Sequence, residues 1–174
     1  GRALVVLFAL APRFLEAAYR QYAFMLEGLR QVERELSELS IPFSVLSGEP
    51  PQTLSREVRR IKAAALVVDF DPLRVKRKWV EGVCEQIVVP VHEVDSRNIV
   101  PARFVTDKQE YAAHTLRRKL VPLLPEFLEI PPTPERHPHK PDTEFHRPDW
   151  QALEDSLEVD RSVRSEERRV GKEC

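Results

Sequence analysis

The chain has 174 residues, of which 42% are hydrophobic and 32% are charged. This length suits one ordinary domain with some additional chain, and the composition is typical of a soluble globular protein. The formal net charge of -1 excludes an overall basic surface for a polyanion, so any nucleic-acid contact has to be local. Two cysteines are too few for a disulfide framework. No stretch approaches the roughly 20 apolar residues of a membrane span, so no membrane association is expected. The few cysteines fit a reducing compartment and no secretion signal is recognised, so a cytoplasmic protein is expected.

Four short runs rich in β-branched or aromatic residues alternate with helical patterns in the first 105 residues. The predicted strands are Ala3–Leu10, Phe43–Leu46, Ala65–Phe70 and Val89–Val94. This alternation is the signature of βα units that build a parallel sheet, and the mostly continuous apolar runs suit strands covered on both faces. The sequence therefore predicts an α/β fold with a Rossmann-like, doubly wound parallel sheet.

The longest helix is predicted between the first two strands. Its apolar residues recur every three or four positions and form one stripe, made of Tyr22, Met25, Leu29, Val32, Leu36 and Leu39. A second helix is predicted at about Thr53–Lys62. A third is expected to begin at Asp71 and Pro72, because aspartate favours the N-cap and proline the first helical position.

A fourth helix start is predicted by the Thr-x-x-Gln pattern at Thr106–Gln109, where each end side chain can satisfy the backbone amide of the other. Pro122 should end or kink this helix, because proline lacks the backbone N–H group. From Pro131 to Pro148 the chain holds six of its 15 prolines and few apolar residues. That segment predicts an extended linker and a domain boundary.

Helical spacing resumes at Trp150, Leu153 and Leu157, as though a second domain began there. The final residues, RSEERRVGKEC, read like the translation of a sequencing-adapter oligonucleotide; a natural solvated tail is the alternative. The predicted organisation is an α/β domain in residues 1–130, a proline-rich linker in 131–149, the start of a helical domain in 150–163, and an artefact in 164–174.

Ligands of parallel sheets bind beyond the carboxyl ends of the strands. The candidate cofactor-binding residues chosen by this rule are Asp69, Phe70, Arg74, Asp95 and Asn98. No Gly-x-Gly-x-x-Gly or Gly-Lys-Ser/Thr phosphate loop occurs, which argues against an ordinary dinucleotide or nucleoside-triphosphate site. Asp69 and Asp71 could hold a ligand hydroxyl or a metal ion. The favoured interpretation is structural, with Asp71 capping the third helix and Asp69 tying down the turn.

The remaining histidines, basic residues and possible nucleophiles predict no further site. His137, His139 and His146 lack the cysteine or carboxylate partners of a metal centre, so no metal is expected. The basic cluster at residues 74–78 beside Trp79 is interpreted as solvated helix charge rather than as a phosphate-binding patch. No Ser/His/Asp or Cys/His constellation can be assembled, so the sequence predicts no catalytic residue.

Five strings in order resemble landmarks of class II DNA photolyases. They are RQYAFMLEGL at 20–29, VDFDPLR at 68–74, EVDSRNIVP at 93–101, KQEYAAHTLR at 108–117 and SLEVDRSV at 156–163. Two departures stand out: Ser96 and Arg97 replace a familiar Ala-His pair, and Arg118 replaces a proline. The resemblance covers nearly all of residues 1–163, and Arg97 weakens detailed ligand inference at its loop.

The resemblance implies a deoxyribodipyrimidine photo-lyase, a light-dependent enzyme that splits cyclobutane pyrimidine dimers by electron transfer from reduced FAD. It implies that damaged DNA and FAD bind an all-helical carboxyl-terminal domain outside this chain, so that this part alone is inactive. The α/β domain is expected to help hold an antenna chromophore, often a deazaflavin, and the intact parent is expected to be a monomer.

The same resemblance implies that a strand and a helix of the α/β domain precede residue 1. The missing first strand is normally central, so its absence would expose strand edges and make the piece unstable alone. Two alternatives stay open: a cryptochrome-like blue-light photoreceptor, and a generic nucleotide- or flavin-binding α/β module without photochemistry.

Overall fold

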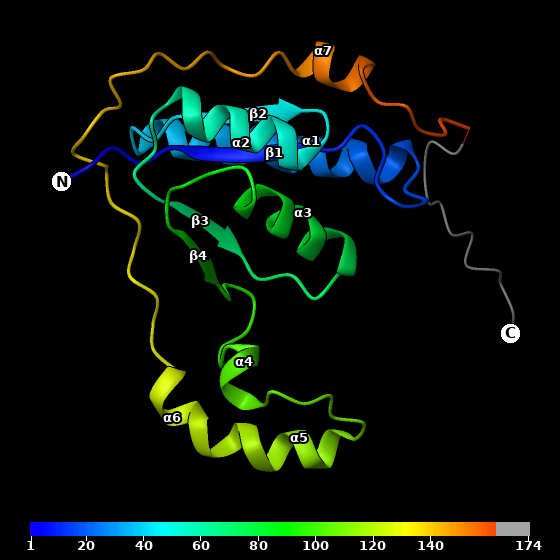
Figure 1. Ribbon diagram of the computed structural model, residues 1–174, viewed down its shortest axis with the longest axis vertical. Coiled ribbons are helices and arrows are strands. Elements are labelled where there is room, and N and C mark those ends of the chain that lie inside the picture. The colour runs from blue at the N-terminus through cyan, green and yellow to red at the C-terminus, as the bar shows by residue number, and fades with distance from the viewer. Residues whose placement is uncertain (163–174) are drawn as a thin grey trace, which may run out of the picture. The chain divides into compact units, whose positions relative to one another are not determined.

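The computed structural model describes residues 1–162, shown as a ribbon in Figure 1. The described chain divides into two compact units. The first unit comprises residues 1–57 together with the segment from residue 134 onward, and the second unit comprises residues 58–133. No helix within residues 1–162 is both long and apolar enough to cross a membrane.

The first unit is built on a two-stranded parallel sheet. Strand β1 (Val6–Leu10) pairs with β2 (Phe43–Ser47), and helix α1 (Tyr19–Glu38) connects them. Helix α2 (Pro50–Arg60) follows and contains the boundary between the units. The predicted apolar stripe faces the core in part, because Tyr22, Met25 and Leu29 pack with Leu10, whereas Val32 is 38% exposed. Leu26, which is not a member of the predicted stripe, is also buried.

The second unit repeats the strand–helix–strand arrangement. Strand β3 (Leu66–Asp69) pairs in parallel with β4 (Val91–Val94), and helix α3 (Arg74–Cys84) connects them. Three short helices follow: α4 (Ala102–Val105), α5 (Ala113–Leu120) and α6 (Leu124–Phe127). The rings of Phe104 and Phe127 meet edge to face, 5.4 Å apart, and join α4 to α6.

The structure confirms the α/β class with parallel strands, arranged in small sheets. All four predicted strands are present: β1 and β4 are shorter by three and two residues at the start, β3 is shorter by one residue at each end, and β2 is longer by one. Pro122 acts as predicted, because the α-helical pattern stops at Leu120 and the chain continues as a 3-10 turn, Val121–Leu123. The predicted domain boundaries stay predictions.

The predicted helix start at Thr106 is wrong. Thr106 lies in extended backbone, and α5 begins only at Ala113. The Thr106 hydroxyl accepts the backbone N–H of Lys108, at 3.2 Å, and the side-chain ammonium of Lys119, also at 3.2 Å. A local turn therefore uses the hydroxyl that the capping box would need at the Gln109 amide.

The segment of residues 134–162, here called the return segment, runs back onto the first unit. Near the start of this segment, the His137 amide donates a hydrogen bond to the Leu39 carbonyl oxygen at 2.7 Å. Its later part forms α7 (Trp150–Asp155), whose N-cap Asp149 accepts the Ala152 amide at 3.0 Å. The predicted linker thus contains no helix or strand between residues 134 and 149, and helical spacing does resume at Trp150.

The end of the return segment completes the core of the first unit. Leu157 is 6% exposed and belongs to the same cluster as Leu10, Tyr22 and Leu26. Its neighbours add backbone hydrogen bonds: the Glu158 amide donates to Pro12, and the Tyr19 amide donates to Asp160. The residues expected to open another domain therefore pack against α1.

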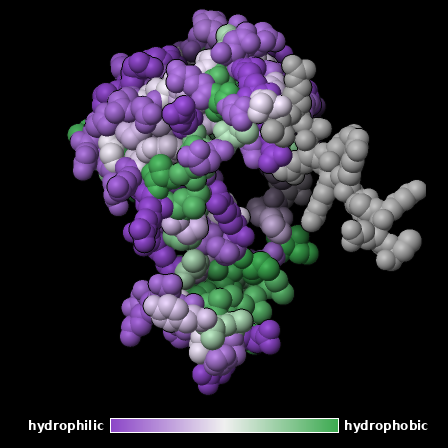
Figure 2. Space-filling view, turned by 90° about the vertical axis from the view of Figure 1, so that its right-hand side faces the viewer, coloured by the Kyte–Doolittle hydropathy of each residue, from purple (hydrophilic) through white to green (hydrophobic). Residues whose placement is uncertain are grey.

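Apolar side chains also gather on the surface of the second unit. They lie on α4 to α6 and the chain that follows, where Figure 2 shows a broad apolar area; the large exposed members are Phe104, Tyr111, Leu116, Val121, Leu128 and Ile130. Contiguous apolar patches on soluble proteins commonly mark contact surfaces. This area is named the α4–α6 surface.

Each small sheet leaves strand edges unpaired within the described residues. The Leu66 amide donates to Pro90 beside β4, so the backbone groups of the next residue, Val67, face the open edge of β3. The Val67 side chain is 63% exposed. An open edge of this kind can pair with another chain.

We expect replacement of Leu157 by alanine to lower the free energy of unfolding by about 2–4 kcal/mol, because it empties a packed core position. Urea unfolding monitored by tryptophan fluorescence measures this loss. The control is Leu4→Ala, at a site 46% exposed in the same unit, which should cost less than about 1 kcal/mol. Equal losses in the two variants would contradict the assigned role of Leu157.

We expect Val67→Lys to reduce concentration-dependent self-association, because a charged residue on an edge strand opposes pairing with another chain. Sedimentation velocity over a concentration series measures the effect. The matched control is Val88→Lys, at a fully exposed valine outside the strands. Association that persists equally in both variants would show that the β3 edge does not drive it.

Candidate functional site

The carboxyl ends of β3 and β4 lie side by side. Asp69 is in register with Val94, and the Phe70 amide donates to the Val94 carbonyl oxygen at 2.8 Å. Two loops, residues 70–73 and 95–101, therefore leave the same edge of the sheet. All five candidate residues named from the sequence lie in or next to these loops, so the strand-end rule identifies one continuous region.

Asp95 organises the loop after β4. Its Oδ1 accepts the backbone amides of Arg97 and Asn98, each at 3.2 Å, and its Oδ2 accepts the Ala102 amide at 2.8 Å. The Asn98 Nδ2 donates to both carboxylate oxygens, at 3.0 and 2.9 Å. The Ala102 amide, with Asn98 and the Arg97 amide, holds the pKa of Asp95 below its usual value, against a smaller effect of burial. Asp95 and Asn98 thus fix the loop onto the start of α4.

Asp69 joins the two strand-end loops. Its Oδ1 accepts a hydrogen bond from the Ser96 hydroxyl at 2.7 Å. The sequence interpretation had Asp69 tie down its own turn, but this contact reaches the loop after β4 instead. A carboxylate at the end of one parallel strand can do this because the neighbouring loop begins at the same edge.

Asp71 is the most deeply buried charge of the site, at 7% exposure. Its Oδ2 lies 2.9 Å from the Lys76 ammonium and 3.1 Å from the Arg97 guanidinium. Burial raises the pKa of Asp71, but the Leu73 amide and the two cations outweigh it and lower the pKa overall. Arg97 therefore connects the β4 loop to the β3 loop.

The predicted N-cap role of Asp71 is wrong. Helix α3 begins at Arg74, and Leu73 occupies the N-cap in extended backbone. Asp71 instead accepts the Leu73 amide through Oδ1, at 2.9 Å, two residues along the chain. This short Asx-type turn satisfies the carboxylate before the helix begins, so the helix starts two residues later than the sequence pattern indicates.

Phe70 and Arg74 are the candidates with capacity left for a ligand. The Arg103 guanidinium lies over the Phe70 ring, 5.6 Å from its centroid, and pairs with Glu93 at 2.8 Å. The Arg74 side chain is exposed and forms no hydrogen bond or ion pair with any residue that the structure describes. An aromatic ring and an uncompensated guanidinium at the two ends of the loop 70–73 suit a planar ligand that carries a negative charge.

Sequence reasoning missed Lys76, Arg97 and Arg103 as members of this region. Lys76 belongs to the cluster interpreted as solvated helix charge, yet it pairs with buried Asp71. Arg97 could have been singled out from the sequence, because Ser96 and Arg97 replace an Ala-His pair that is familiar in similar sequences. Within residues 1–162, no group of three or more histidine, cysteine or acidic side chains is positioned to hold a metal ion.

Comparisons with known proteins agree on one family. A family model described as DNA photolyase matches residues 1–139. The deoxyribodipyrimidine photo-lyase of Potorous tridactylus is 42% identical over 164 residues, which cover 92% of this chain and 31% of that relative. The protein of the same name from Arabidopsis thaliana is 39% identical, with 72% of this chain and 26% of the relative covered.

A third photo-lyase of that name, from the archaeon Methanothermobacter thermautotrophicus, is 35% identical over 125 residues; the match covers 72% of this chain and 28% of the relative. The matches therefore reach from mammal and plant to an archaeal protein. In each case the chain spans about a quarter to a third of the relative's length.

We expect Asp95→Ala to lower the free energy of unfolding at pH 7 by about 1–2 kcal/mol, as for the loss of a capping carboxylate. The folded-state pKa of Asp95 lies below its unfolded value near 4, so this stabilisation is present above about pH 4 and is lost as the pH falls through the folded pKa. Urea unfolding across pH 2.5–7 measures the difference between the variants (about five pH values suffice).

The control for this prediction is Asp107→Ala, at an exposed aspartate outside the strand-end loops. It should change the stability little at any pH. A difference between wild type and Asp95→Ala that stays constant down to pH 2.5 would mean that the carboxylate is not the source of the stabilisation.

Proposed function

Because the chain belongs to the DNA photolyase family, we propose that it is the amino-terminal α/β part of a class II photolyase that repairs cyclobutane pyrimidine dimers. The observation that carries the proposal is the family match over residues 1–139. The ordered strings that resemble class II sequences support the finer assignment. We further propose a monomeric, cytoplasmic enzyme whose substrate is damaged DNA.

The chemistry of repair is assigned to a part of the enzyme outside this chain. Reduced FAD, bound in a helical domain, would supply the electron that opens the dimer. Two observations support this division. The strand-end carboxylates Asp69, Asp71 and Asp95 are all engaged in internal contacts, which leaves none poised for catalysis. The apolar α4–α6 surface, defined above, is suited to packing against a further domain.

The role proposed for this chain is to hold an antenna chromophore at the carboxyl ends of β3 and β4. Arg74 would attract an anionic group of a deazaflavin-type chromophore, and the Phe70 ring would contact its planar system. Both residues fit such a group, since Arg74 is exposed and Phe70 already bears a cation over one region of its ring. Such a chromophore, when bound, supplies additional absorbed light.

The other candidates are proposed to position these two residues. Asp95 and Asn98 hold their loop onto α4, which carries Arg103 and so the cation over Phe70. Asp69 and Arg97 connect that loop to the segment that leads into Arg74. Each of these side chains forms a hydrogen bond or an ion pair within the protein, so the loops are preorganised before any ligand binds.

We expect a chimera to retain light-dependent repair when residues 1–162 replace the matching segment of the Potorous tridactylus photo-lyase. Loss of cyclobutane dimers from irradiated oligonucleotides, with and without light, measures the activity. A chimera that folds and binds flavin but leaves the dimers intact would contradict the proposal that this chain is the α/β part of a photolyase.

The antenna role is tested by Arg74→Ala in the same chimera, reconstituted with a deazaflavin. The repair rate should fall at limiting light and stay unchanged at saturating light, because an antenna changes only the rate of excitation. The matched control is Arg77→Ala, at another exposed arginine of α3. Equal rates for the two variants at limiting light would remove Arg74 from the proposed site.

A further inference from the structure

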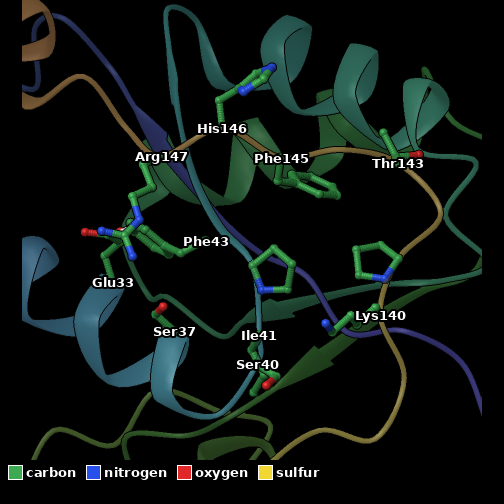
Figure 3. Close-up of a pocket in the computed structure, with 12 residues that line it drawn as sticks. Glu33, Ser37, Ser40, Ile41, Phe43, Lys140, Thr143, Phe145, His146 and Arg147 are labelled. Carbon is green, nitrogen blue, oxygen red and sulfur yellow. Dashed lines mark ion pairs between the residues drawn. The ribbon is translucent and has the colours of Figure 1, made fainter.

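The first unit contains a hollow that is separate from the strand-end loops. Its volume is about 380 Å³, and it lies between the end of α1, the start of β2 and the return segment. Figure 3 shows Phe43, from β2, and Phe145, from the return segment, both extending into the space between these segments. The size falls within the range of pockets that hold small organic ligands.

The return segment crosses the hollow as an arch that is fastened at both ends. Before the arch, the Arg136 Nε donates to the Ser40 hydroxyl at 2.9 Å, next to the hydrogen bond between His137 and Leu39. After it, the Arg147 guanidinium lies 3.5 Å from the Glu33 carboxylate. The hollow is therefore bounded by two fixed points on the same unit.

Aromatic packing strengthens the second fixed point. The Trp150 ring stacks on Phe43, with centroids 6.4 Å apart, and the Arg30 guanidinium lies over Trp150 at 5.7 Å. Prolines stiffen the arch itself, since Pro138 and Pro141 restrict the backbone and cannot donate to a neighbouring strand. These features fix the arch where it bounds the hollow.

The lining of the hollow combines apolar walls with polar rims. Phe145 contributes half-buried apolar surface, and Ile41 and Phe43, which are 9% and 6% exposed, add small apolar areas. Ser37, Ser40 and Lys140 lie along one side in Figure 3, and Thr143 and His146 lie along the other. A flat ligand ring in contact with Phe145 would meet the hydrogen-bonding groups of these polar rims at its edges.

The charge of the lining selects an anion. Glu33 is the only acidic residue among the described lining residues, and Arg147 neutralises it. The Lys140 ammonium has no ion-pair or hydrogen-bond partner among the residues that the structure describes. Lys140 is exposed at the rim of the hollow, and an unneutralised cation there favours a ligand with a carboxylate or a similar acidic group.

We propose that this hollow, named the arch pocket, binds a small planar aromatic acid. The ring lies against Phe145 and reaches the small exposed part of Phe43, and the acidic group faces Lys140. The pocket shares no residue with the strand-end loops of the second unit. Its ligand therefore does not depend on the proposed antenna site, and either proposal can fail without the other.

The test uses the full chain and two matched probes, 2-naphthoate and its uncharged analogue 2-naphthamide. Isothermal titration calorimetry should show saturable 1:1 binding of 2-naphthoate that is tighter than that of 2-naphthamide. Lys140→Met should weaken 2-naphthoate binding about fivefold, as for one partly exposed charge pair, and leave 2-naphthamide unchanged. Phe145→Ala should weaken both probes, because it removes one wall.

The control is Lys108→Met, at an exposed lysine of the second unit, which should bind both probes like the wild type. Three results would overturn the proposal: no saturable binding of 2-naphthoate, equal affinity for the two probes, or the same affinities in Lys140→Met and Lys108→Met. Higher salt should weaken 2-naphthoate binding in the wild type and have less effect in Lys140→Met.

Discussion

Parallel pairing of strands is the constraint that determines the strand–helix–strand arrangement of both units. Two parallel neighbours cannot be joined by a tight turn, so the chain must cross over between them, and it does so through α1 in one unit and α3 in the other. The same pairing brings both carboxyl ends to one edge. That is why Asp69 can reach Ser96, and Arg97 can reach Asp71, although each pair is more than 25 residues apart in sequence.

The return segment shows how residues that follow a proline-rich stretch can complete a core begun far earlier in the chain. It contributes Leu157 to the core and Trp150 to the ring stack on Phe43. Glu154 accepts the Tyr19 hydroxyl and approaches Arg30, and the Arg161 guanidinium lies over the Tyr19 ring at 4.6 Å. The hydrogen bond to Glu154 raises the pKa of Tyr19, and burial and the Glu154 charge raise it further. The first unit therefore owes part of its packing to residues more than a hundred positions beyond α1.

The elements that depend on local patterns were predictable, whereas the caps were not. Continuous apolar runs located all four strands, and three- to four-residue spacing located α1. Helix starts failed at Asp71 and Thr106, because a short polar side chain has several amides within reach and the nearer turn competes with the cap. The strand-end rule selected residues that lie at one edge of the sheet, but it could not separate Arg74, which is exposed, from Asp95, whose carboxylate binds amides of its own loop.

By itself, the sequence determined the α/β class, the order of strands and helices, and the resemblance to photolyases, because these depend on periodicity and on ordered strings of residues. Only the tertiary structure decided which polar groups are paired and where the return segment lies. Pairing depends on distances between loops that are remote in sequence, as with Asp71 and Arg97. The open arch over Phe43 likewise requires two distant attachments, at Ser40 and Glu33, that no local pattern encodes.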